Sequence, residues 1–345
     1  MQVEAEVLPG LKPFALDELR ARLGESADIV PGADQDAIPF RYDGPVRRLH
    51  SLRTVVAVYC VLHFDIPRPR ALLGHEHLTR LLRAIDDVRA LHPPSAFRTF
   101  RFSAAGKDSP VFNRLRDELS THTGLINDPE EADLFLRVRP AQTHPVGWEV
   151  LIRLSPRPLS TRAWRVCDMP GALNATIAAA MVEATHPLPR DRFLNPMCGS
   201  GTLIIERLGR SPASQAVGCD IDPDVLACAQ ENLIAAGLAR MVTLARMDAT
   251  ALNFPDASFD AICADLPWGQ LIGSHTENKV LYPAALSEWS RVAAPGARLA
   301  VITHEVNLFE TLIEPFAHLW ALRDSFFVFQ GGLHPRVYVF ERVGR

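Results

Sequence analysis

The chain has 345 residues, of which 48% are hydrophobic and 22% are charged, and its formal net charge at pH 7 is −4. This composition excludes an intrinsically disordered protein, and the length is sufficient for two or three domains. No apolar run approaches the length of a membrane span, and the first residues lack the basic start and apolar core of a signal peptide. We therefore expect a globular, monomeric protein of the cytoplasm with no membrane partner.

The cysteines are scattered along the chain and never form a C-x-x-C pair, which argues against a zinc site and against a disulfide framework. There are six of them: Cys60, Cys167, Cys198, Cys219, Cys228 and Cys263. We expect reduced thiols and no bound metal.

Charge is unevenly distributed along the chain. Residues 1–160 carry 21 acidic and 21 basic side chains, and residues 161–345 carry 19 and 15. Basic residues gather in a first cluster (Arg98, Arg101, Lys107, Arg114, Arg116) and a second cluster (Arg137, Arg139, Arg153, Arg157, Arg162, Arg165). Contact with phosphates requires only a local basic face, so the net charge does not exclude a nucleic-acid partner. Charge alone equally allows scattered, solvated arginines.

The beginning of the chain predicts a small α/β layer. Residue patterns indicate strands at 2–8, 37–42 and 55–64 and helices at 11–23 and 46–52. This β-α-β-α-β order is typical of a ferredoxin-like sheet with helices on one face. We place an N-terminal ferredoxin-like domain at residues 1–55.

A second group of elements follows and ends in a linker. Helices are predicted at 76–91 and 110–119, and strands at 97–102, 133–139 and 147–154. The strand at 97–102 alternates arginine with aromatic residues, which predicts one basic and one apolar face. Residues 156–170 predict a linker, and a helix of small residues follows at 171–184.

The turn Asn195–Thr202 organises the second half of the chain. Phe193 and Leu194 end a predicted buried strand, and an apolar helix begins after the turn. Gly199 and Gly201 let the backbone approach a ligand closely, and the helix N-terminus favours an anionic group. Such a turn after the first strand of a doubly wound sheet is typical of a nucleotide site.

Spacing narrows the choice of nucleotide. The third glycine of the dinucleotide fingerprint is absent, and no Gly-Lys-Ser/Thr follows, which excludes a P-loop. Asp220 stands 19 residues beyond Gly201 at a second predicted strand end, where a carboxylate can hold two ribose hydroxyls. Further strands are predicted at 242–245, 259–264, 298–303, 325–330 and 336–342, with helices at 224–236, 281–292 and 309–316.

Residues Asn195–Thr202 closely resemble the first motif of class I S-adenosylmethionine-dependent methyltransferases. The resemblance implies a Rossmann-like α/β sheet of seven strands whose last pair is antiparallel, with S-adenosylmethionine as cofactor. It implies cofactor contacts at Asn195, Pro196, Cys198, Gly199, Ser200, Gly201, Thr202, Asp220, Ile221, Asp248, Ala249 and Asp265.

The motif Asp265-Leu-Pro-Trp-Gly269 follows the fourth strand of this sheet and resembles the Asn/Asp-Pro-Pro-aromatic motif of amino-methyltransferases. The Asp265 carboxylate and a backbone carbonyl near Pro267 can bond both hydrogens of an exocyclic amine and turn its lone pair toward the methyl group. Trp268 offers a face on which a flipped base can stack. Leu266 stands where proline is commonest, which weakens an assignment to adenine N6.

The order of elements in residues 56–160, followed by Pro-Leu-Ser-Thr-Arg-Ala-Trp-Arg at 158–165, resembles a THUMP domain that runs into its methyltransferase partner. The resemblance implies a THUMP RNA-binding domain at 56–160, a class I methyltransferase domain at 161–345, and binding of the 3′ acceptor end of tRNA. Substrate contacts are then expected at Arg98, Arg101, Lys107, Arg162, Arg165 and Trp268, and catalytic roles at Asp265, Pro267 and Trp268.

The implied function is methyl transfer to the exocyclic N2 of a guanosine in tRNA, at position 6 of the acceptor stem. An rRNA guanine-N2 methyltransferase remains an alternative because it can share both modules. An amide methyltransferase acting on protein glutamine is disfavoured because it leaves residues 56–160 without a role. A non-catalytic THUMP RNA-binding protein is opposed by the intact Gly199, Gly201, Asp220 and Asp265.

Overall fold

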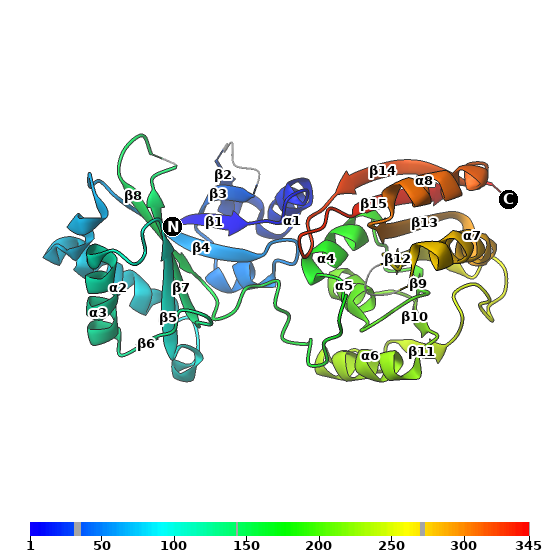
Figure 1. Ribbon diagram of the computed structural model, residues 1–345, viewed down its shortest axis with the longest axis horizontal. Coiled ribbons are helices and arrows are strands. Elements are labelled where there is room, and N and C mark those ends of the chain that lie inside the picture. The colour runs from blue at the N-terminus through cyan, green and yellow to red at the C-terminus, as the bar shows by residue number, and fades with distance from the viewer. Residues whose placement is uncertain (31–35, 143, 270–272, 345) are drawn as a thin grey trace. The chain divides into compact units, whose positions relative to one another are not determined.

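The computed structural model describes residues 1–30, 36–142, 144–269 and 273–344. The chain forms two compact units (Figure 1). The first unit comprises residues 1–8 and 15–160, and the second comprises residues 9–14 and 161–345. Among the described residues, no helix is both long and apolar enough to cross a membrane.

The first unit contains one eight-stranded sheet of order β2-β3-β1-β4-β8-β7-β5-β6. Its strands are β1 (Gln2–Glu6), β2 (Ala27–Ile29), β3 (Ala37–Tyr42), β4 (Ala57–Phe64), β5 (Thr99–Ala104), β6 (Ile126–Asn127), β7 (Leu134–Pro140) and β8 (Trp148–Arg153). Its helices are α1 (Lys12–Leu23), α2 (His75–Arg89) and α3 (Pro110–Thr123), with short 3-10 helices at Gly24–Ser26, Val46–Ser51, Pro69–Leu73 and Pro94–Ala96. The pairs that β5 makes with β6 and β7 are parallel.

Alternation along the strands separates the two faces of this sheet. In β4, Val58 and Phe64 belong to the main core, whereas Tyr59 and Val61 belong to a small cluster on the opposite face. Helices α2 and α3 lie side by side in Figure 1 and contribute their apolar stripes to the main core. The predicted strands and helices of this unit are confirmed, and the short strands β2 and β6 were missed.

The division of the first unit at residue 55 stays a prediction. The strands β1, β2 and β3 precede this position, and β4 follows it. Because β4 pairs with both β1 and β8, one continuous sheet joins the two predicted parts.

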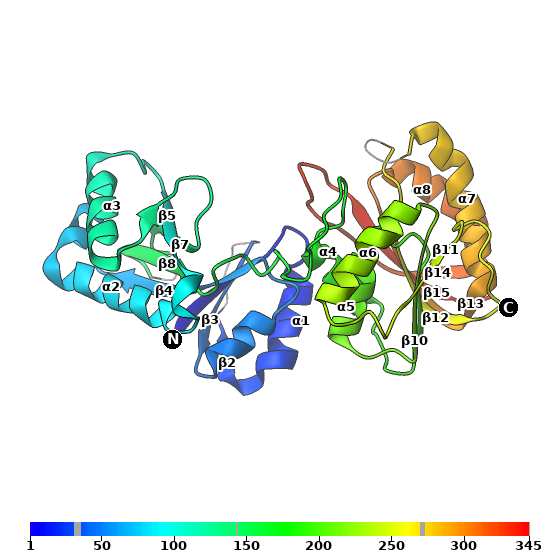
Figure 2. The same cartoon turned by 90° about the horizontal axis from the view of Figure 1, so that it is seen from below.

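The second unit contains a seven-stranded sheet of order β11-β10-β9-β12-β13-β15-β14. Its strands are β9 (Arg192–Asn195), β10 (Gln215–Asp220), β11 (Thr243–Arg246), β12 (Phe259–Asp265), β13 (Ala293–Thr303), β14 (Trp320–Phe327) and β15 (Arg336–Arg342). Its helices are α4 (Ala175–Ala184), α5 (Thr202–Arg210), α6 (Pro223–Ala235), α7 (His275–Val292) and α8 (Val306–Ile313), followed by a 3-10 helix at Glu314–Phe316. Figure 2 shows α4, α5 and α6 on one side of the sheet and α7 and α8 on the other.

The topology of this sheet confirms the predicted Rossmann-like fold. The strands β11, β10, β9, β12 and β13 are parallel, and β15 runs antiparallel to both β13 and β14. The first strand, β9, lies between β10 and β12, so the strand order reverses there. The carboxyl ends of these three strands therefore meet at a topological switch point, where doubly wound proteins bind ligands.

One expectation about cysteine is wrong. Cys167 and Cys228 form a disulfide, with their Cα atoms 5.4 Å apart and a sequence separation of 61. Asn232, one turn further along α6, donates from Nδ2 to the carbonyls of Cys167 (2.9 Å) and Ser200 (3.0 Å). The pairing depends on tertiary placement, so the spacing of the cysteines carried no signal for it.

Candidate active site

The glycine turn after β9 has the backbone geometry that its sequence predicts. Gly199 and Gly201 have φ angles of +52° and +83°, in the left-handed region that glycine adopts readily. Gly201 is the N-cap of α5, and the Cys198 N–H donates to the Cys219 carbonyl at 2.8 Å, so the turn is fixed to the end of β10. The other predicted contacts in the turn, Pro196, Cys198, Ser200 and Thr202, are buried.

Asp220 ends β10 directly opposite this turn. Its Oδ2 accepts from the Gly199 N–H at 3.0 Å, and its Oδ1 accepts from the Asp222 N–H at 3.2 Å. Ile221, the next residue, is 61% exposed and offers an apolar surface beside the carboxylate. The turn and the carboxylate predicted from spacing therefore lie together, and two backbone N–H groups orient the carboxylate.

Asp248 and Ala249 follow β11 at the same edge of the sheet. Asp248 is exposed, and its Oδ1 accepts from the backbone N–H (2.8 Å) and hydroxyl (2.7 Å) of Thr250. Ala249 is buried, and its carbonyl accepts from the Trp289 indole at 3.1 Å. Both residues lie at the predicted strand end, and their contact with a cofactor stays a prediction.

Asn195 connects the two central strands of the site. It is fully buried, and its Nδ2 donates to the carbonyls of Cys263 (2.8 Å) and Met197 (3.3 Å). Its Oδ1 is buried and has no hydrogen-bond partner among the described residues. A buried acceptor without a donor is costly, and such atoms are concentrated at sites that bind a ligand or water.

Asp265 ends β12 and carries the most perturbed carboxyl of the site. Burial raises the pKa of Asp265 to about 7, and the hydrogen bond from Trp268 opposes this rise only in part. The Trp268 Nε1–H donates to Asp265 Oδ1 at 3.0 Å. A carboxyl with a raised pKa at the switch point of the sheet is a strong candidate for a catalytic group.

The structure narrows the identity of the backbone acceptor near Pro267. The Pro267 carbonyl already accepts from the Tyr282 hydroxyl at 2.5 Å and from the Asn278 Nδ2 at 2.9 Å. These two donors occupy both lone pairs of the carbonyl oxygen. The preceding carbonyl, that of Leu266, is therefore the better candidate to accept from an amine beside Asp265.

Sequence reasoning missed the side chains behind this turn. Asn278 and Tyr282 lie on α7, which begins at His275, whereas the predicted helix began at residue 281 and so contained Tyr282 but not Asn278. The capping Ser274, whose hydroxyl accepts from the Glu277 N–H at 3.2 Å, was the available signal for the earlier start.

Two arginines predicted to contact substrate have other partners in the second unit. Arg162 is buried and donates from Nε to Oε1 of the fully buried Glu206 at 2.9 Å. Arg165 donates to the Leu173 carbonyl (2.7 Å) and to Thr202 Oγ1 (2.9 Å). Their hydrogen bonds do not support an RNA-binding role and instead fix this part of the predicted linker against α5.

The first basic cluster is more accessible. Arg98 and Lys107 are exposed, and the Arg114 side chain is 71% exposed. Arg101 is half-buried, with its guanidinium 4.9 Å from the centre of the Phe135 ring. The cluster therefore contains three cationic side chains that solvent reaches directly.

Most of the second basic cluster is neutralised by acidic residues or held by carbonyls. Arg137 donates to Glu6 at 2.9 Å, and Arg139 donates to Glu4 at 3.0 Å and to Glu149 at 3.1 Å. Arg153 is buried and bonded to backbone carbonyls, including that of Ser155 at 2.9 Å. These side chains stabilise the sheet of the first unit, so the first cluster is the better candidate for phosphate contact.

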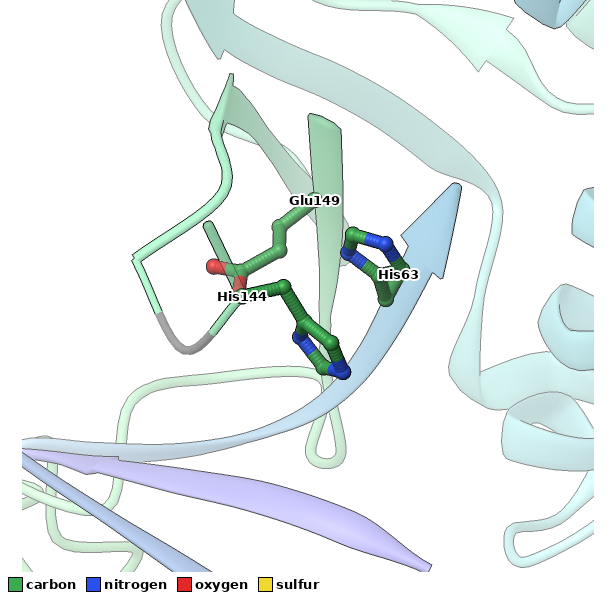
Figure 3. Close-up of side chains that lie close together, drawn as sticks. All are labelled: His63, His144 and Glu149. Atoms are coloured by element: carbon green, nitrogen blue, oxygen red, sulfur yellow. The ribbon is translucent and has the colours of Figure 1, made fainter. Parts of the chain in front are cut away.

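Figure 3 shows His63, His144 and Glu149, whose potential ligand atoms lie within 4.8 Å of one another. The two imidazole rings stack 3.8 Å apart at an angle of 20°, so their in-plane lone pairs are nearly parallel and cannot converge on one ion. Glu149 also accepts from Arg139 and from the Gln142 N–H. As arranged, the three side chains do not fit a metal, and the expected lack of a metal remains a prediction.

The fold and the strand-end residues define a class I methyltransferase domain. Comparison with known families agrees: the RMKL-like methyltransferase domain matches residues 162–336. The chain belongs to this family.

Several relatives are named as guanine-N2 methyltransferases of tRNA. A tRNA (guanine(6)-N2)-methyltransferase of Thermus thermophilus is 29% identical over 99% of this chain and 100% of its own length. The human tRNA (guanine(6)-N(2))-methyltransferase THUMP3 is 32% identical over 50% of this chain. The chain spans only 36% of that human relative. The crystal structure of TrmN from Thermus thermophilus superimposes with a TM-score of 0.73 and 26% identity, covering 99% of each chain.

Proposed function

We propose that this protein transfers a methyl group from S-adenosylmethionine to the exocyclic N2 of a guanosine in tRNA, at position 6 of the acceptor stem. The observation that carries the proposal is Asp265, a half-buried carboxyl at the end of β12 whose pKa is raised to about 7 by desolvation. The full-length likeness to the Thermus thermophilus tRNA (guanine(6)-N2)-methyltransferase supports the choice of substrate.

The strand-end residues fit the cofactor. The left-handed glycines of the turn leave the backbone open to close approach, and the Asp220 carboxylate is oriented by two N–H groups to accept from ribose hydroxyls. Ile221 is exposed beside it and can cover an apolar ring edge. When bound, S-adenosylmethionine supplies an electrophilic methyl group on a sulfonium.

Asp265 orients the amine that accepts this methyl group. Its Oδ1 is held by Trp268, which leaves Oδ2 to accept one hydrogen of the guanine amine. The Leu266 carbonyl accepts the other hydrogen, so the nitrogen lone pair points away from the turn. Positive charge that develops on nitrogen is stabilised by the ionised carboxylate, and Oδ2 can take the proton that leaves.

Trp268 and the first basic cluster act on the RNA. The indole edge is tied to Asp265, so its face is positioned to stack on an extruded base. Arg98, Lys107 and Arg114 are exposed cations that can contact phosphates of the acceptor end through the predicted THUMP domain. We also propose that the protein acts as a monomer in the cytoplasm, where tRNA is abundant.

The test is to incubate the purified protein with labelled S-adenosylmethionine and either tRNA or rRNA, and to digest the product to nucleosides. We expect N2-methylguanosine from tRNA. A tRNA transcript with adenosine in place of guanosine at position 6 is the matched control and should remain unmethylated. Label in rRNA only, or in N6-methyladenosine, would overturn the assignment.

A further inference from the structure

Three side chains behind the catalytic turn Asp265–Gly269 remain without a role in the proposed reaction. Tyr282 is fully buried on α7, and its hydroxyl lies 2.5 Å from the Pro267 carbonyl and 3.0 Å from Thr303 Oγ1. Asn278, one helical turn earlier, is also fully buried and donates to the same carbonyl. Thr303, at the end of β13, is fully buried too, and its Oγ1 accepts from the Glu305 N–H at 3.0 Å.

The directions of these hydrogen bonds follow from chemistry. A carbonyl oxygen can only accept, so the Tyr282 hydroxyl must donate to Pro267. The Tyr282 oxygen then accepts from the Thr303 hydroxyl, because the single Tyr282 proton is already used. A directed chain therefore runs from the Glu305 N–H through Thr303 and Tyr282 to the Pro267 carbonyl. Burial raises the pKa of Tyr282, so the hydroxyl keeps its proton throughout the physiological range.

These hydrogen bonds hold a turn that contains the reacting group. Asp265 precedes Pro267 by two residues, and Trp268, which bonds Asp265 Oδ1, follows it directly. The turn is therefore held at two points, by β12 at one end and by the hydrogen bonds to the Pro267 carbonyl at the other. A shift of this carbonyl would move both the carboxylate and the indole.

We propose that Tyr282 and Asn278 are positioning residues that hold the Pro267 carbonyl and so fix the catalytic turn in register with β13. The inference rests on the proposed function, because it assumes that Asp265 orients the acceptor amine. Helix α7 would then position the catalytic turn in addition to packing against the sheet. Displacement of a reacting group by about 1 Å can cost on the order of a hundredfold in rate.

The experiment compares four variants on whichever of tRNA and rRNA the wild-type protein methylates. Tyr282→Phe removes only the donor, and we expect kcat to fall by about tenfold to a hundredfold while the KM values for RNA and cofactor stay within about twofold. Thr303→Val should also lower kcat, and Thr303→Ser should restore it because the hydroxyl is kept. The double variant Tyr282→Phe/Thr303→Val should be no slower than Tyr282→Phe, since both break one chain.

Tyr338→Phe is the matched control. Tyr338 is a buried tyrosine of the same core that donates to Glu310 at 2.9 Å, so its variant loses an equivalent hydrogen bond away from the turn. We expect its kcat to be unchanged. Wild-type kcat in Tyr282→Phe, an effect on KM alone, or an equal loss in Tyr338→Phe would overturn the positioning role. Methylation of rRNA in place of tRNA would contradict the proposed substrate and leave these comparisons valid.

Discussion

The two ends of strand β12 each carry an aspartate, and their surroundings shift the two pKa values in opposite directions. At the start of the strand, Asp260 accepts from Arg192 Nε at 3.0 Å and Nη2 at 2.9 Å, and these hydrogen bonds lower the pKa of Asp260. At the end of the strand, burial raises the pKa of Asp265 to about 7, and its carboxyl accepts from the neutral indole of Trp268. The two residues are five positions apart.

The contrast extends across the sheet. At the amino ends of the strands, Asp191 lies between Arg207 (3.0 Å) and Arg298 (2.5 Å), so these charges are paired, although the buried Arg207 Nε has no hydrogen-bond partner among the described residues. At the carboxyl ends, the buried Oδ1 atoms of Asn195 and Asn278 have no hydrogen-bond partner among the described residues. Satisfied groups stabilise a fold, whereas unsatisfied and destabilised groups are retained where they serve a ligand or a reaction. One end of the sheet therefore maintains structure, and the other is available for chemistry.

The largest expected effect is at the amino end. Asp191→Ala leaves the fully buried Arg207 without its carboxylate partner, and we expect a loss of about 3–5 kcal/mol in the free energy of unfolding. Denaturant titration measures it. The matched control is Asp256→Ala. The Asp256 side chain pairs with Arg291 and is 78% exposed, so breaking this ion pair should cost less than about 1 kcal/mol. Equal losses in the two variants would remove the distinction.

At the carboxyl end, Asp220→Ala should weaken binding of S-adenosylmethionine by about tenfold to a hundredfold, because hydrogen bonds to a charged group are lost. Titration calorimetry measures the affinity. Asp222→Ala serves as control, since Asp222 caps α6 by accepting from the Asp224 N–H at 2.8 Å and should cost stability but not affinity. Unchanged affinity in folded Asp220→Ala would refute the ribose assignment.

The two aspartates of β12 should give stability opposite dependences on pH. The raised pKa of Asp265 contributes stability at pH values below about 4, and that contribution is lost as pH rises through about 7. The lowered pKa of Asp260 contributes stability above about pH 4, which is lost on acidification. At pH 8, the melting temperature of Asp265→Asn should therefore lie above that of the wild type, and the melting temperature of Asp260→Asn should lie below it. The same sign for both variants would show that the two environments do not differ.

The smallest expected effect concerns the first basic cluster. Arg98→Gln/Lys107→Gln should reduce the slope of log affinity for tRNA against log salt by about 1 to 2, since each phosphate contact contributes roughly 0.7 to 0.9. Filter binding over a range of salt concentrations measures the slope. Arg20→Gln/Arg323→Gln removes two exposed charges elsewhere and should leave it unchanged. A larger change in this control would place the RNA on another face.

The sequence predicted the parts of the site that depend on local pattern. The glycine turn, Asp220 and Asp265 each follow a short apolar strand, so periodicity placed each at a strand end, and the resemblance to methyltransferase motifs assigned them to one site. Arg162 resembled a phosphate contact because its partner Glu206 lies 44 residues away, and no local pattern indicates a tertiary ion pair.

The same reason explains what the sequence did not predict about the catalytic turn. The bond between Tyr282 and Thr303 joins residues 21 positions apart on a helix and a strand, and their meeting depends on how α7 packs against β13. The Cys167–Cys228 disulfide is likewise a consequence of tertiary packing.

The most direct test of the central claim is a single-turnover comparison of wild type and Asp265→Ala with tRNA and labelled cofactor. Asp265 is proposed to act on charge that develops in the transition state, so we expect the rate of N2-methylguanosine formation to fall by about a hundredfold to a thousandfold. The affinities for tRNA and cofactor should change little, because most of their contacts lie elsewhere. Asp265→Asn keeps an acceptor oxygen and should retain more activity than Asp265→Ala. Wild-type rates in Asp265→Ala would contradict the amine-orienting mechanism.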